Sequence, residues 1–202
     1  MSTPVREEPR PLVKAIAVNV GIVAVMWLLE LIDQLTRNSL DRFGIQPRDF
    51  TELGDIFLAP WLHFGWAHIA SNSIPFIVLG VIIYLSGAMR WVVTTLVTAV
   101  VSGLTVWLIS PPNTNTLGAS GIVFGFLTYV LVRGFFTKKL GQILIALVVL
   151  AVYGGILWGV LPTQEGVSWQ GHLGGAIGGV LAAWIMHSKK ARAGRADARR
   201  AR

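Results

Sequence analysis

Apolar residues occur in six long runs along the chain, separated by shorter polar stretches. Each run is close in length to the roughly 20 residues that cross the apolar part of a bilayer as a helix. A helix suits that environment because it forms its backbone hydrogen bonds internally. The pattern therefore predicts an all-α polytopic membrane protein with six transmembrane helices, at residues 15–34, 67–86, 91–109, 119–136, 140–161 and 172–187.

The composition of the chain also indicates a membrane protein. Apolar residues make up 53% of the sequence and charged residues only 13%, and the mean hydropathy is +0.63. A typical soluble domain has about 25% charged residues. Cysteine does not occur in the 202 residues, so disulfides, thiolate metal ligands and a cysteine nucleophile are excluded.

The basic residues predict the orientation of the chain, because Lys and Arg favour cytoplasmic loops. With both termini in the cytoplasm, all of the basic residues except Arg37, Arg42 and Arg48 lie on the cytoplasmic side. Seven of the 17 lie in the last 14 residues, where a basic tail at an anionic lipid surface explains the net charge more simply than a nucleic-acid partner. We expect a multi-pass protein of the cell membrane (the inner membrane in bacteria).

A single membrane domain is expected over residues 14–188. Residues 1–13 contain three prolines and are predicted to be a disordered cytoplasmic segment, and residues 189–202 form a basic cytoplasmic tail. Residues 33–66 mix apolar and charged side chains and are predicted to lie partly in the outer interface. His187 is expected at the inner interface, beside the tail.

Polar groups able to carry out acyl transfer lie at the starts of three predicted helices. His68 and Asn72 open the second, Ser120 the fourth and His172 the sixth. These helices all run inward in the predicted topology, so the four groups lie at a similar depth below the outer face. Any one of them alone is explained as well by an interfacial or interhelical hydrogen bond. Together they favour a functional site, because polar groups inside a bilayer are costly.

Small residues recur at four-residue intervals in the fourth and sixth predicted helices: Gly121, Gly125, Gly175 and Gly179. Glycines at this spacing let two helix backbones approach closely in a membrane. Ordinary helix packing explains the pattern equally well. In either case, close contact between these two helices is expected to bring Ser120 and His172 within hydrogen-bond reach.

These segments resemble the rhomboid intramembrane serine proteases. The resemblance rests on HFGWAHIASN at residues 63–72, on GASG at 118–121 followed by Phe124, and on GHLGGAIGG at 171–179. It covers about residues 55–188. It implies a six-helix bundle with both termini cytoplasmic that needs no metal or other cofactor. Its implied partners are transmembrane proteins whose helices unwind easily and are cut near the outer face.

The resemblance also implies roles for individual residues. The serine of the family's GxSG motif is the nucleophile, the histidine of the sixth helix is its base, and a histidine and an asparagine of the second helix help to form the oxyanion hole. Those roles fall on Ser120, His172, His68 and Asn72. Gly118 permits a tight loop before the serine. The family usually has tyrosine at the position of Phe124, so the stacking surface is kept and a hydroxyl hydrogen bond is lost.

Other mechanisms and functions remain as alternatives. Asp and Glu are absent from the second to sixth predicted helices, which favours a Ser-His dyad over a triad and opposes aspartyl and HExxH zinc proteases. His63, His68 and His172 form an alternative zinc set. A catalytically silent rhomboid-like protein that binds membrane helices as a chaperone or trafficking factor is the alternative in another class. The intact Ser120 and His172 favour the protease, and no inverted repeat indicates a transporter.

Overall fold

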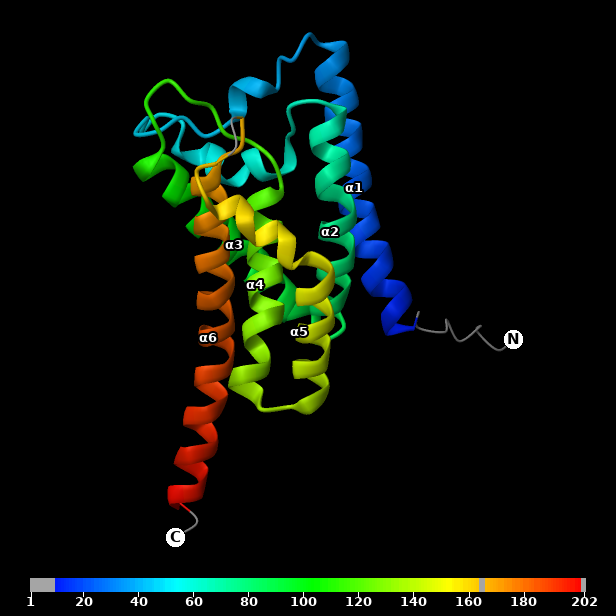
Figure 1. Cartoon of the computed structure of the whole chain (residues 1–202), viewed down its shortest axis with the longest axis vertical. Helices are drawn as coiled ribbons and strands as arrows, with labels where there is room; N and C mark the ends of the chain where they lie inside the picture. The colour runs from blue at the N-terminus through cyan, green and yellow to red at the C-terminus, as the bar shows by residue number, and fades with distance from the viewer. Residues whose placement is uncertain (1–9, 164–165, 201–202) are drawn as a thin grey trace, which may run out of the picture.

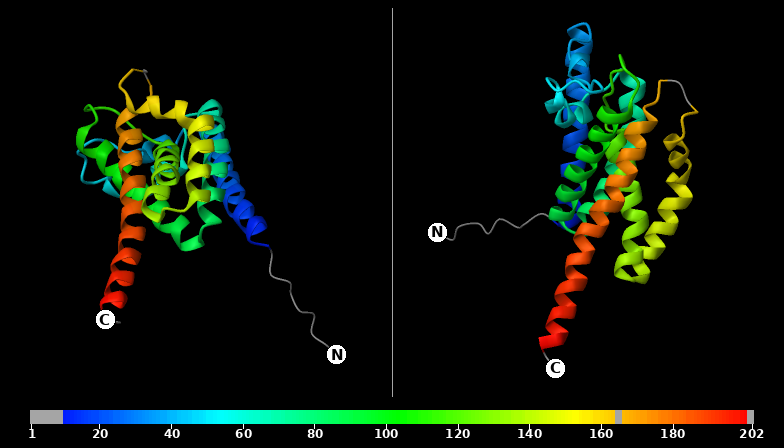
Figure 2. Two further views of the ribbon diagram at one scale, coloured as in Figure 1. Left: turned by 60° about the horizontal axis from the view of Figure 1, so that its bottom comes forward. Right: turned by 90° about the vertical axis from the view of Figure 1, so that its left-hand side faces the viewer.

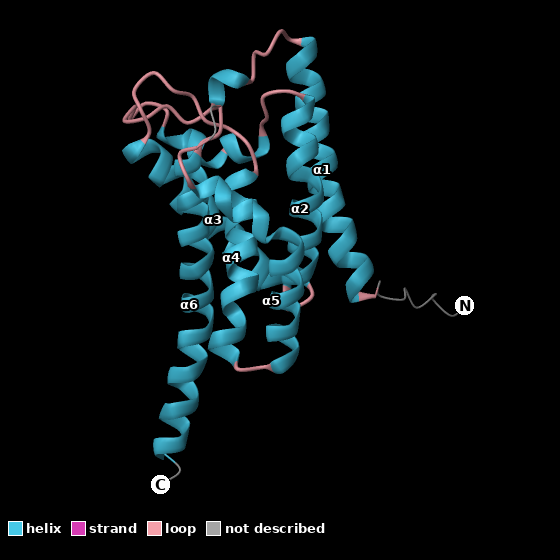
Figure 3. Cartoon of the chain, in the orientation of Figure 1, coloured by secondary structure: helices cyan, strands magenta, loops and turns pink. Residues whose placement is uncertain are grey.

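The structure is a computed structural model that describes residues 10–163 and 166–200. Helices dominate these residues and no β-strand occurs among them (Figure 3), which confirms the predicted all-α class. The α-helices are α1 (Pro11–Leu35), α2 (Trp66–Tyr84), α3 (Ala88–Ile109), α4 (Ser120–Thr137), α5 (Leu140–Tyr153) and α6 (Trp169–Arg200). Four 3₁₀ segments connect them: η1 (Asp41–Phe43), η2 (Leu53–Phe57), η3 (Ala59–Trp61) and η4 (Gly154–Val160).

Five helical segments of the described residues are long and apolar enough to cross a membrane: Pro11–Leu35, Trp66–Tyr84, Ala88–Ile109, Ser120–Thr137 and Leu140–Val160. They coincide with the first five predicted spans. The helix α6 covers the predicted sixth span at 172–187 but is not among the five, since Gln170, His172 and its glycines lower its mean hydropathy. The chain is therefore a multi-pass membrane protein, and its sixth span stays a prediction.

The helix α4 lies in the middle of the bundle (Figure 1). In α4, 61% of the membrane-spanning stretch is buried, against 11% in the stretch Leu140–Val160. The most extensive contacts join α4 to α6 and α3 to α6. Large apolar side chains are exposed on the outward surfaces of α1, α3 and α5, as expected of helices that face lipid rather than water.

The backbones of α4 and α6 approach closely where glycines of the two helices face each other. A Cβ atom added to Gly125 would lie 2.9 Å from the carbonyl oxygen of Gly175. In the reverse direction, Cβ atoms on Gly175 and Gly179 would collide with the carbonyl groups of Gly121 and Gly125. Only glycine permits backbone contact of this kind, and the contact holds the first turn of α6 beside the first turn of α4.

The first helix begins earlier than predicted. The helix α1 starts at Pro11 rather than at residue 15, because proline at the first helical position gives up an N–H group that has no acceptor within the helix. Residues 11–13 are therefore helical and do not belong to a disordered segment. Arg10 is the N-cap residue of α1, and residues 1–9 of the predicted segment lie outside the described residues.

The fifth predicted helix, at 140–161, also differs from the structure. Its α-helical part ends at Tyr153, and η4 continues as a 3₁₀ segment that runs across the bundle toward the start of α6 (Figure 1). Gly154, the C-cap residue of α5, lies at the change of direction, where glycine weakens the helix by its backbone freedom. This bend brings Gly159 close to Phe124 and His172.

The connection between α1 and α2 packs against the connection between α3 and α4. Both lie at the end of the bundle where α4 and α6 begin, whereas α6 extends past the other helices at the opposite end (Figure 2). The Arg48 guanidinium donates to the Ser110 carbonyl at 2.9 Å, and Ile45 and Thr116 form an antiparallel bridge. An apolar cluster fills the space beneath: Ile45, Ile56, Ala59, Leu62, Val106 and Leu117. The predicted outer loop is thus a packed support for the start of α4.

Candidate active site

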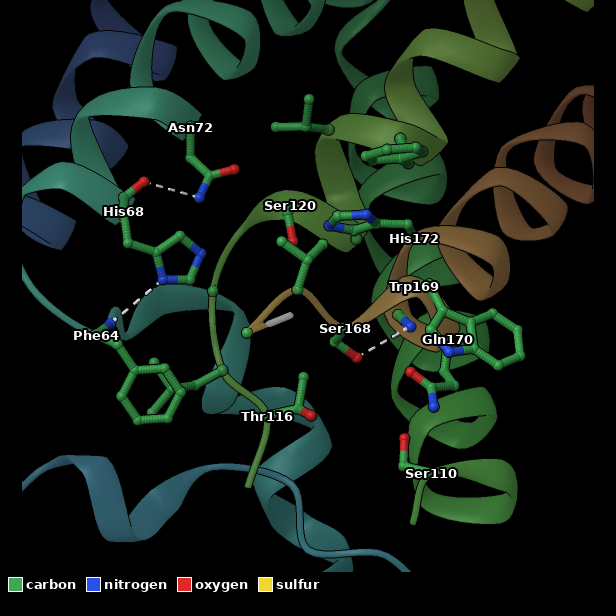
Figure 4. A pocket seen from close by; sticks show the side chains of 18 of the residues that line it. Phe64, His68, Asn72, Ser110, Thr116, Ser120, Ser168, Trp169, Gln170 and His172 are labelled. Carbon is green, nitrogen blue, oxygen red and sulfur yellow. Dashed lines mark hydrogen bonds between the residues drawn. The ribbon is translucent and has the colours of Figure 1, made fainter. Parts of the chain in front are cut away.

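A cavity of about 710 Å³ opens at the end of the bundle where α4 and α6 begin (Figure 4). Parts of α2, α4, α6 and η4 line it, together with most of the polar segment 110–118. Six of the predicted site residues lie in its wall: His68, Asn72, Gly118, Ser120, Phe124 and His172. Gly121 also reaches the cavity, while Gly125, Gly175 and Gly179 lie deeper in the contact between α4 and α6.

Ser120 is the first residue of α4, and a short loop places it at the cavity. Gly118 in that loop has φ +126°, in the left-handed region that residues with a side chain rarely adopt. The Gly118 N–H donates to the Ala59 carbonyl at 2.9 Å, and the Ala119 N–H donates to His63 Nε2 at 3.3 Å. These two hydrogen bonds fix the loop on both sides of its glycine.

The start of α4 has no side-chain cap. Its N-cap residue is Ala119, which forms no capping hydrogen bond, whereas Ser, Thr, Asp or Asn at this position would occupy one of the free N–H groups. The N–H groups of the first helical turn have no acceptor inside the helix. Ser120 and Gly121 therefore contribute N–H donors at the positive end of the helix dipole, where a negative charge is stabilised.

His172 lies in the first turn of α6, and its ring is fixed from two sides. The ring stacks on that of Phe124, with centroids 4.1 Å apart and planes inclined by 11°. Its Nδ1 lies 2.9 Å from the Gly159 carbonyl oxygen. A carbonyl oxygen can only accept, so the hydrogen-bond network assigns the proton to Nδ1 and leaves Nε2 as an acceptor.

Ser120 and His172 lie next to each other in the cavity wall (Figure 4). Within the described residues, no hydrogen bond joins the Ser120 hydroxyl to the imidazole. Hydrogen bonds between catalytic groups are often long or poorly aligned without substrate and tighten when it binds. The arrangement thus brings the two groups together without the bond that the sequence led us to expect.

His68 and Asn72 face Ser120 from α2. His68 Nδ1 accepts from the Phe64 N–H at 3.4 Å, which assigns the ring proton to Nε2. The ring packs on Gly118, where an added Cβ atom would lie 2.8 Å from His68 Nε2. Asn72 Nδ2 donates one hydrogen to the His68 carbonyl at 3.1 Å, and its second hydrogen has no acceptor among the described residues. Both side chains thus keep one N–H donor for the cavity.

Gly159 belongs to the candidate site, although the sequence did not predict it. It contributes a backbone carbonyl, and because every residue has one, the sequence does not indicate which carbonyl accepts this hydrogen bond. Its lack of a side chain also matters, because a Cβ atom there would lie 2.9 Å from Phe124 Cζ and 3.0 Å from His172 Nδ1. The sequence shows only a glycine in an apolar segment.

His63 contacts the loop that precedes Ser120. Its Nε2 accepts the Ala119 N–H at 3.3 Å. Its ring also packs edge-on against His68, with centroids 5.1 Å apart. Burial, and to a lesser extent the neighbouring His68, lowers the pKa of His63 to about 3. The ring is therefore neutral at neutral pH and able to accept.

No acidic side chain of the described residues lines the cavity. The described part of the chain also contains no group of three His, Cys, Asp or Glu side chains arranged to hold a metal ion. In the alternative zinc set, one nitrogen of each ring is already hydrogen-bonded to the backbone: Nε2 of His63, Nδ1 of His68 and Nδ1 of His172. The available chemistry is therefore that of a hydroxyl, an imidazole and several N–H donors.

The chain is similar in sequence to a known protein family and to several individual proteins. The Rhomboid domain matches residues 51–189. The chain is 46% identical over 181 residues to an uncharacterized protein of Mycobacterium tuberculosis, covering 85% of this chain and 75% of that protein. An uncharacterized protein of Mycobacterium leprae is 44% identical over 172 residues, with 81% and 68% covered. Rhomboid-like protein 11, chloroplastic, of Arabidopsis thaliana is 31% identical over 142 residues, with 63% and 50% covered.

The matched segment contains the whole cavity. Its lining residues run from Phe64 to His172, inside the 51–189 match. The match also includes the loop that carries Gly118 and Ser120 and the glycines that hold α4 against α6. On the combined ground of sequence, helical architecture and cavity, the chain belongs to the rhomboid family.

Proposed function

We propose that this rhomboid is an intramembrane serine endopeptidase in which Ser120 is the nucleophile and His172 its general base. The observation that carries the proposal is the fixed orientation of His172, whose Nδ1 lies 2.9 Å from the Gly159 carbonyl while its ring stacks on Phe124. This leaves Nε2 to accept the Ser120 proton. A carboxylate is then not needed to orient the imidazole, because a carbonyl and an aromatic ring do so.

The reaction follows from these groups. Ser120 Oγ attacks the carbonyl carbon of the scissile peptide while its proton passes to His172 Nε2, and the imidazolium then protonates the leaving amine. Water must hydrolyse the resulting acyl-enzyme. The cavity, with polar side chains such as Ser110, Thr116 and Gln170 in its wall, provides room for that water beside the ester.

The oxyanion of the tetrahedral intermediate needs hydrogen-bond donors. The candidates are His68 Nε2, the second amide hydrogen of Asn72 and the Ser120 backbone N–H at the start of α4. Removing one donor of this kind from a hydrolase costs roughly 3 kcal/mol of transition-state stabilisation. Gly118 lets the His68 ring lie against the loop, which keeps its donor near Ser120.

We further propose six spans with both termini in the cytoplasm. In this topology the cavity lies near the outer face of the cell membrane, where α4 and α6 begin. The catalytic domain comprises residues 14–188, with residues 33–66 in the outer interface and residues 1–13 and 189–202 in the cytoplasm. The substrates are transmembrane segments of other membrane proteins that unwind near their outer end and present an extended peptide to Ser120.

Activity-based labelling tests this function. Protein purified in detergent is treated with a fluorophosphonate probe and, separately, incubated with a single-span substrate. We expect the wild type to be labelled and to cleave. Ser120→Ala should abolish both, and His172→Ala should lower both by about 10⁴-fold or more. Thermal unfolding curves verify that the variants are folded.

A nearby serine provides the matched control. Ser71 also lines the cavity, but its hydroxyl donates to the His68 carbonyl at 2.7 Å, and no hydrogen bond within the described residues joins it to a histidine ring. Ser71→Ala is expected to keep labelling and cleavage. Undiminished cleavage by Ser120→Ala would refute the mechanism. Absence of both labelling and cleavage in the wild type across several substrates would favour a silent helix-binding protein instead.

A further inference from the structure

A second polar cluster lies near the end of α4 opposite Ser120. Arg133 is 13 residues after Ser120 on this helix, a distance of roughly 20 Å at 1.5 Å per residue. Its side chain is only 3% exposed. Within the described residues, its Nε and Nη1 atoms are buried and have no hydrogen-bond partner. A buried guanidinium without acceptors is strongly unfavourable, so this arrangement indicates a missing anionic group.

The surroundings of Arg133 are rich in donors. Its electrostatic neighbours are Tyr129, one turn earlier on α4, and Arg90 in the first turn of α3. Arg90 Nη1 donates to the Ser86 carbonyl at 2.7 Å, which fixes it at the turn between α2 and α3. His187 of α6 packs on Tyr129, with ring centroids 6.5 Å apart. Two guanidinium groups and a phenol, from α3 and α4, thus interact electrostatically, with Arg133 at the centre, beside α6.

Carboxylates do not neutralise this cluster within the described residues. All acidic side chains that the structure describes lie between Glu30 and Asp55, at the end of the bundle that holds the cavity. On α6, Asp197 is ten residues past His187, roughly 15 Å farther along the helix. Glu7 and Glu8 of the N-terminal segment are the remaining acidic residues on the predicted cytoplasmic side.

We propose that Arg133, Arg90 and Tyr129 bind the phosphate group of an anionic ligand between α3 and α4. Guanidinium groups form short, charge-assisted hydrogen bonds with phosphate oxygens, and a phenol supplies one more donor. In the predicted topology this end of the bundle meets the cytoplasmic leaflet, which carries anionic lipids. A lipid phosphodiester and free phosphate share the required chemistry. The site is separate from Ser120, so it does not depend on the proposed function.

Ligand-dependent stability tests the proposal. Full-length protein in detergent is depleted of lipid, and its melting temperature is followed by tryptophan fluorescence at constant ionic strength. Dioctanoyl phosphatidylglycerol, sodium phosphate and sodium chloride are titrated separately. We expect a saturable rise with the lipid or with phosphate, since a ligand that binds only the folded state stabilises it by mass action. Saturation by the lipid alone identifies a headgroup, and saturation by phosphate identifies the free ion.

The variants establish where the anion binds. Arg133→Gln and Arg90→Gln are expected to raise the half-saturating concentration by about tenfold or more, which corresponds to the loss of one charge-assisted contact. Arg90 is partly exposed at a helix start, so its variant remains informative if Arg133→Gln does not fold. Lys139→Gln is the matched control, because it removes one exposed positive charge next to the end of α4. It should leave the titration unchanged.

Three results would overturn the proposal. The first is an equal rise with chloride, which would indicate general salt screening. The second is an equal effect of Arg133→Gln, Arg90→Gln and Lys139→Gln on the titration. The third is a wild type that does not respond while a Glu7→Gln, Glu8→Gln double variant is destabilised as much as Arg133→Gln, which would place a carboxylate of the chain itself in the site.

Discussion

The Phe124 ring covers the His172 imidazole, with centroids 4.1 Å apart and planes inclined by 11°. The family usually has tyrosine at this position, and the chain keeps the stacking surface without the hydroxyl. The hydrogen bond between His172 Nδ1 and the Gly159 carbonyl provides a second restraint on the ring. The orientation of the proposed base thus depends on two residues from two other segments, Phe124 of α4 and Gly159 of η4.

Replacing the stacking ring should impair turnover more than substrate binding. Phe124→Leu keeps an apolar side chain but removes the aromatic face, which contributes about 0.5–1.5 kcal/mol in stacked pairs. We expect kcat to fall by roughly tenfold with little change in KM. Phe124→Tyr restores the face and serves as the control. An unchanged kcat in Phe124→Leu would show that the stack does not position the base.

A methyl group at Gly159 should displace the base directly. In Gly159→Ala the new Cβ atom would lie 3.0 Å from His172 Nδ1 and 2.9 Å from Phe124 Cζ, so both rings must shift. A misplacement of about 1 Å at a catalytic group can cost 10²-fold in rate, and we expect a loss of kcat of about this size.

Gly155→Ala is the control for Gly159→Ala, because it lies in the same 3₁₀ segment and a Cβ atom there meets nothing within 4 Å. Cleavage assays of both variants, with thermal unfolding measured in parallel, separate displacement of the base from general disruption of η4. Equal activity of the two variants would contradict the role given to Gly159.

The buried His63 should make stability depend on pH. Its pKa is about 3 in the folded protein against 6.5 as the ordinary value, so the unfolded chain binds the extra proton between these limits. Stability contributed by the neutral ring is complete above pH 6.5 and is lost as the pH falls toward 3, with a slope of at most about 1.4 kcal/mol per pH unit. His63→Gln, which can still accept the Ala119 N–H, should reduce this slope in denaturation curves measured in detergent.

Asp41 changes the stability with pH in the opposite direction from His63. Its contribution must therefore be measured separately from that of His63. Burial, followed by the nearby Asp33 and Glu30, raises the pKa of Asp41 to about 6, so the folded state gains stability as the pH falls from 6 toward 3.8. An Asp41→Asn background removes this contribution. If adding His63→Gln to that background leaves the pH dependence of stability unchanged, His63 is not the titrating group.

The contact between α4 and α6 should not tolerate even one methyl group. In Gly175→Ala the Cβ atom would collide with the Gly121 carbonyl group, and overpacking of a tight core costs about 1–3 kcal/mol. Gly21→Ala in α1 is the control, because a Cβ atom there meets nothing within 4 Å and alanine favours the helix. Thermal unfolding in the same detergent compares the two, and equal stability would contradict the close approach.

The sequence predicted best those features that depend on short stretches of the chain. Long apolar runs are helical in lipid because the backbone has no other hydrogen-bond partner there, so the first five spans agree with the structure. The motifs around His68, Ser120 and His172 predicted residues that do line one cavity. The start of α1 and the end of α5 were predicted less well, because hydropathy does not register an N-terminal proline or a change from α to 3₁₀ geometry.

The sequence by itself determined the all-helical membrane class and the residue types that meet at the cavity, since both follow from side-chain chemistry and its spacing. Only the tertiary structure decided that the Gly159 carbonyl is hydrogen-bonded to His172 and that His63 accepts the Ala119 N–H. The same is true of the burial of Arg133 without a described counterion. All residues have a backbone carbonyl, so the residue type does not show which carbonyl accepts a hydrogen bond. Burial and the choice of partner depend on how separate helices pack, and for these residues no local pattern records that packing.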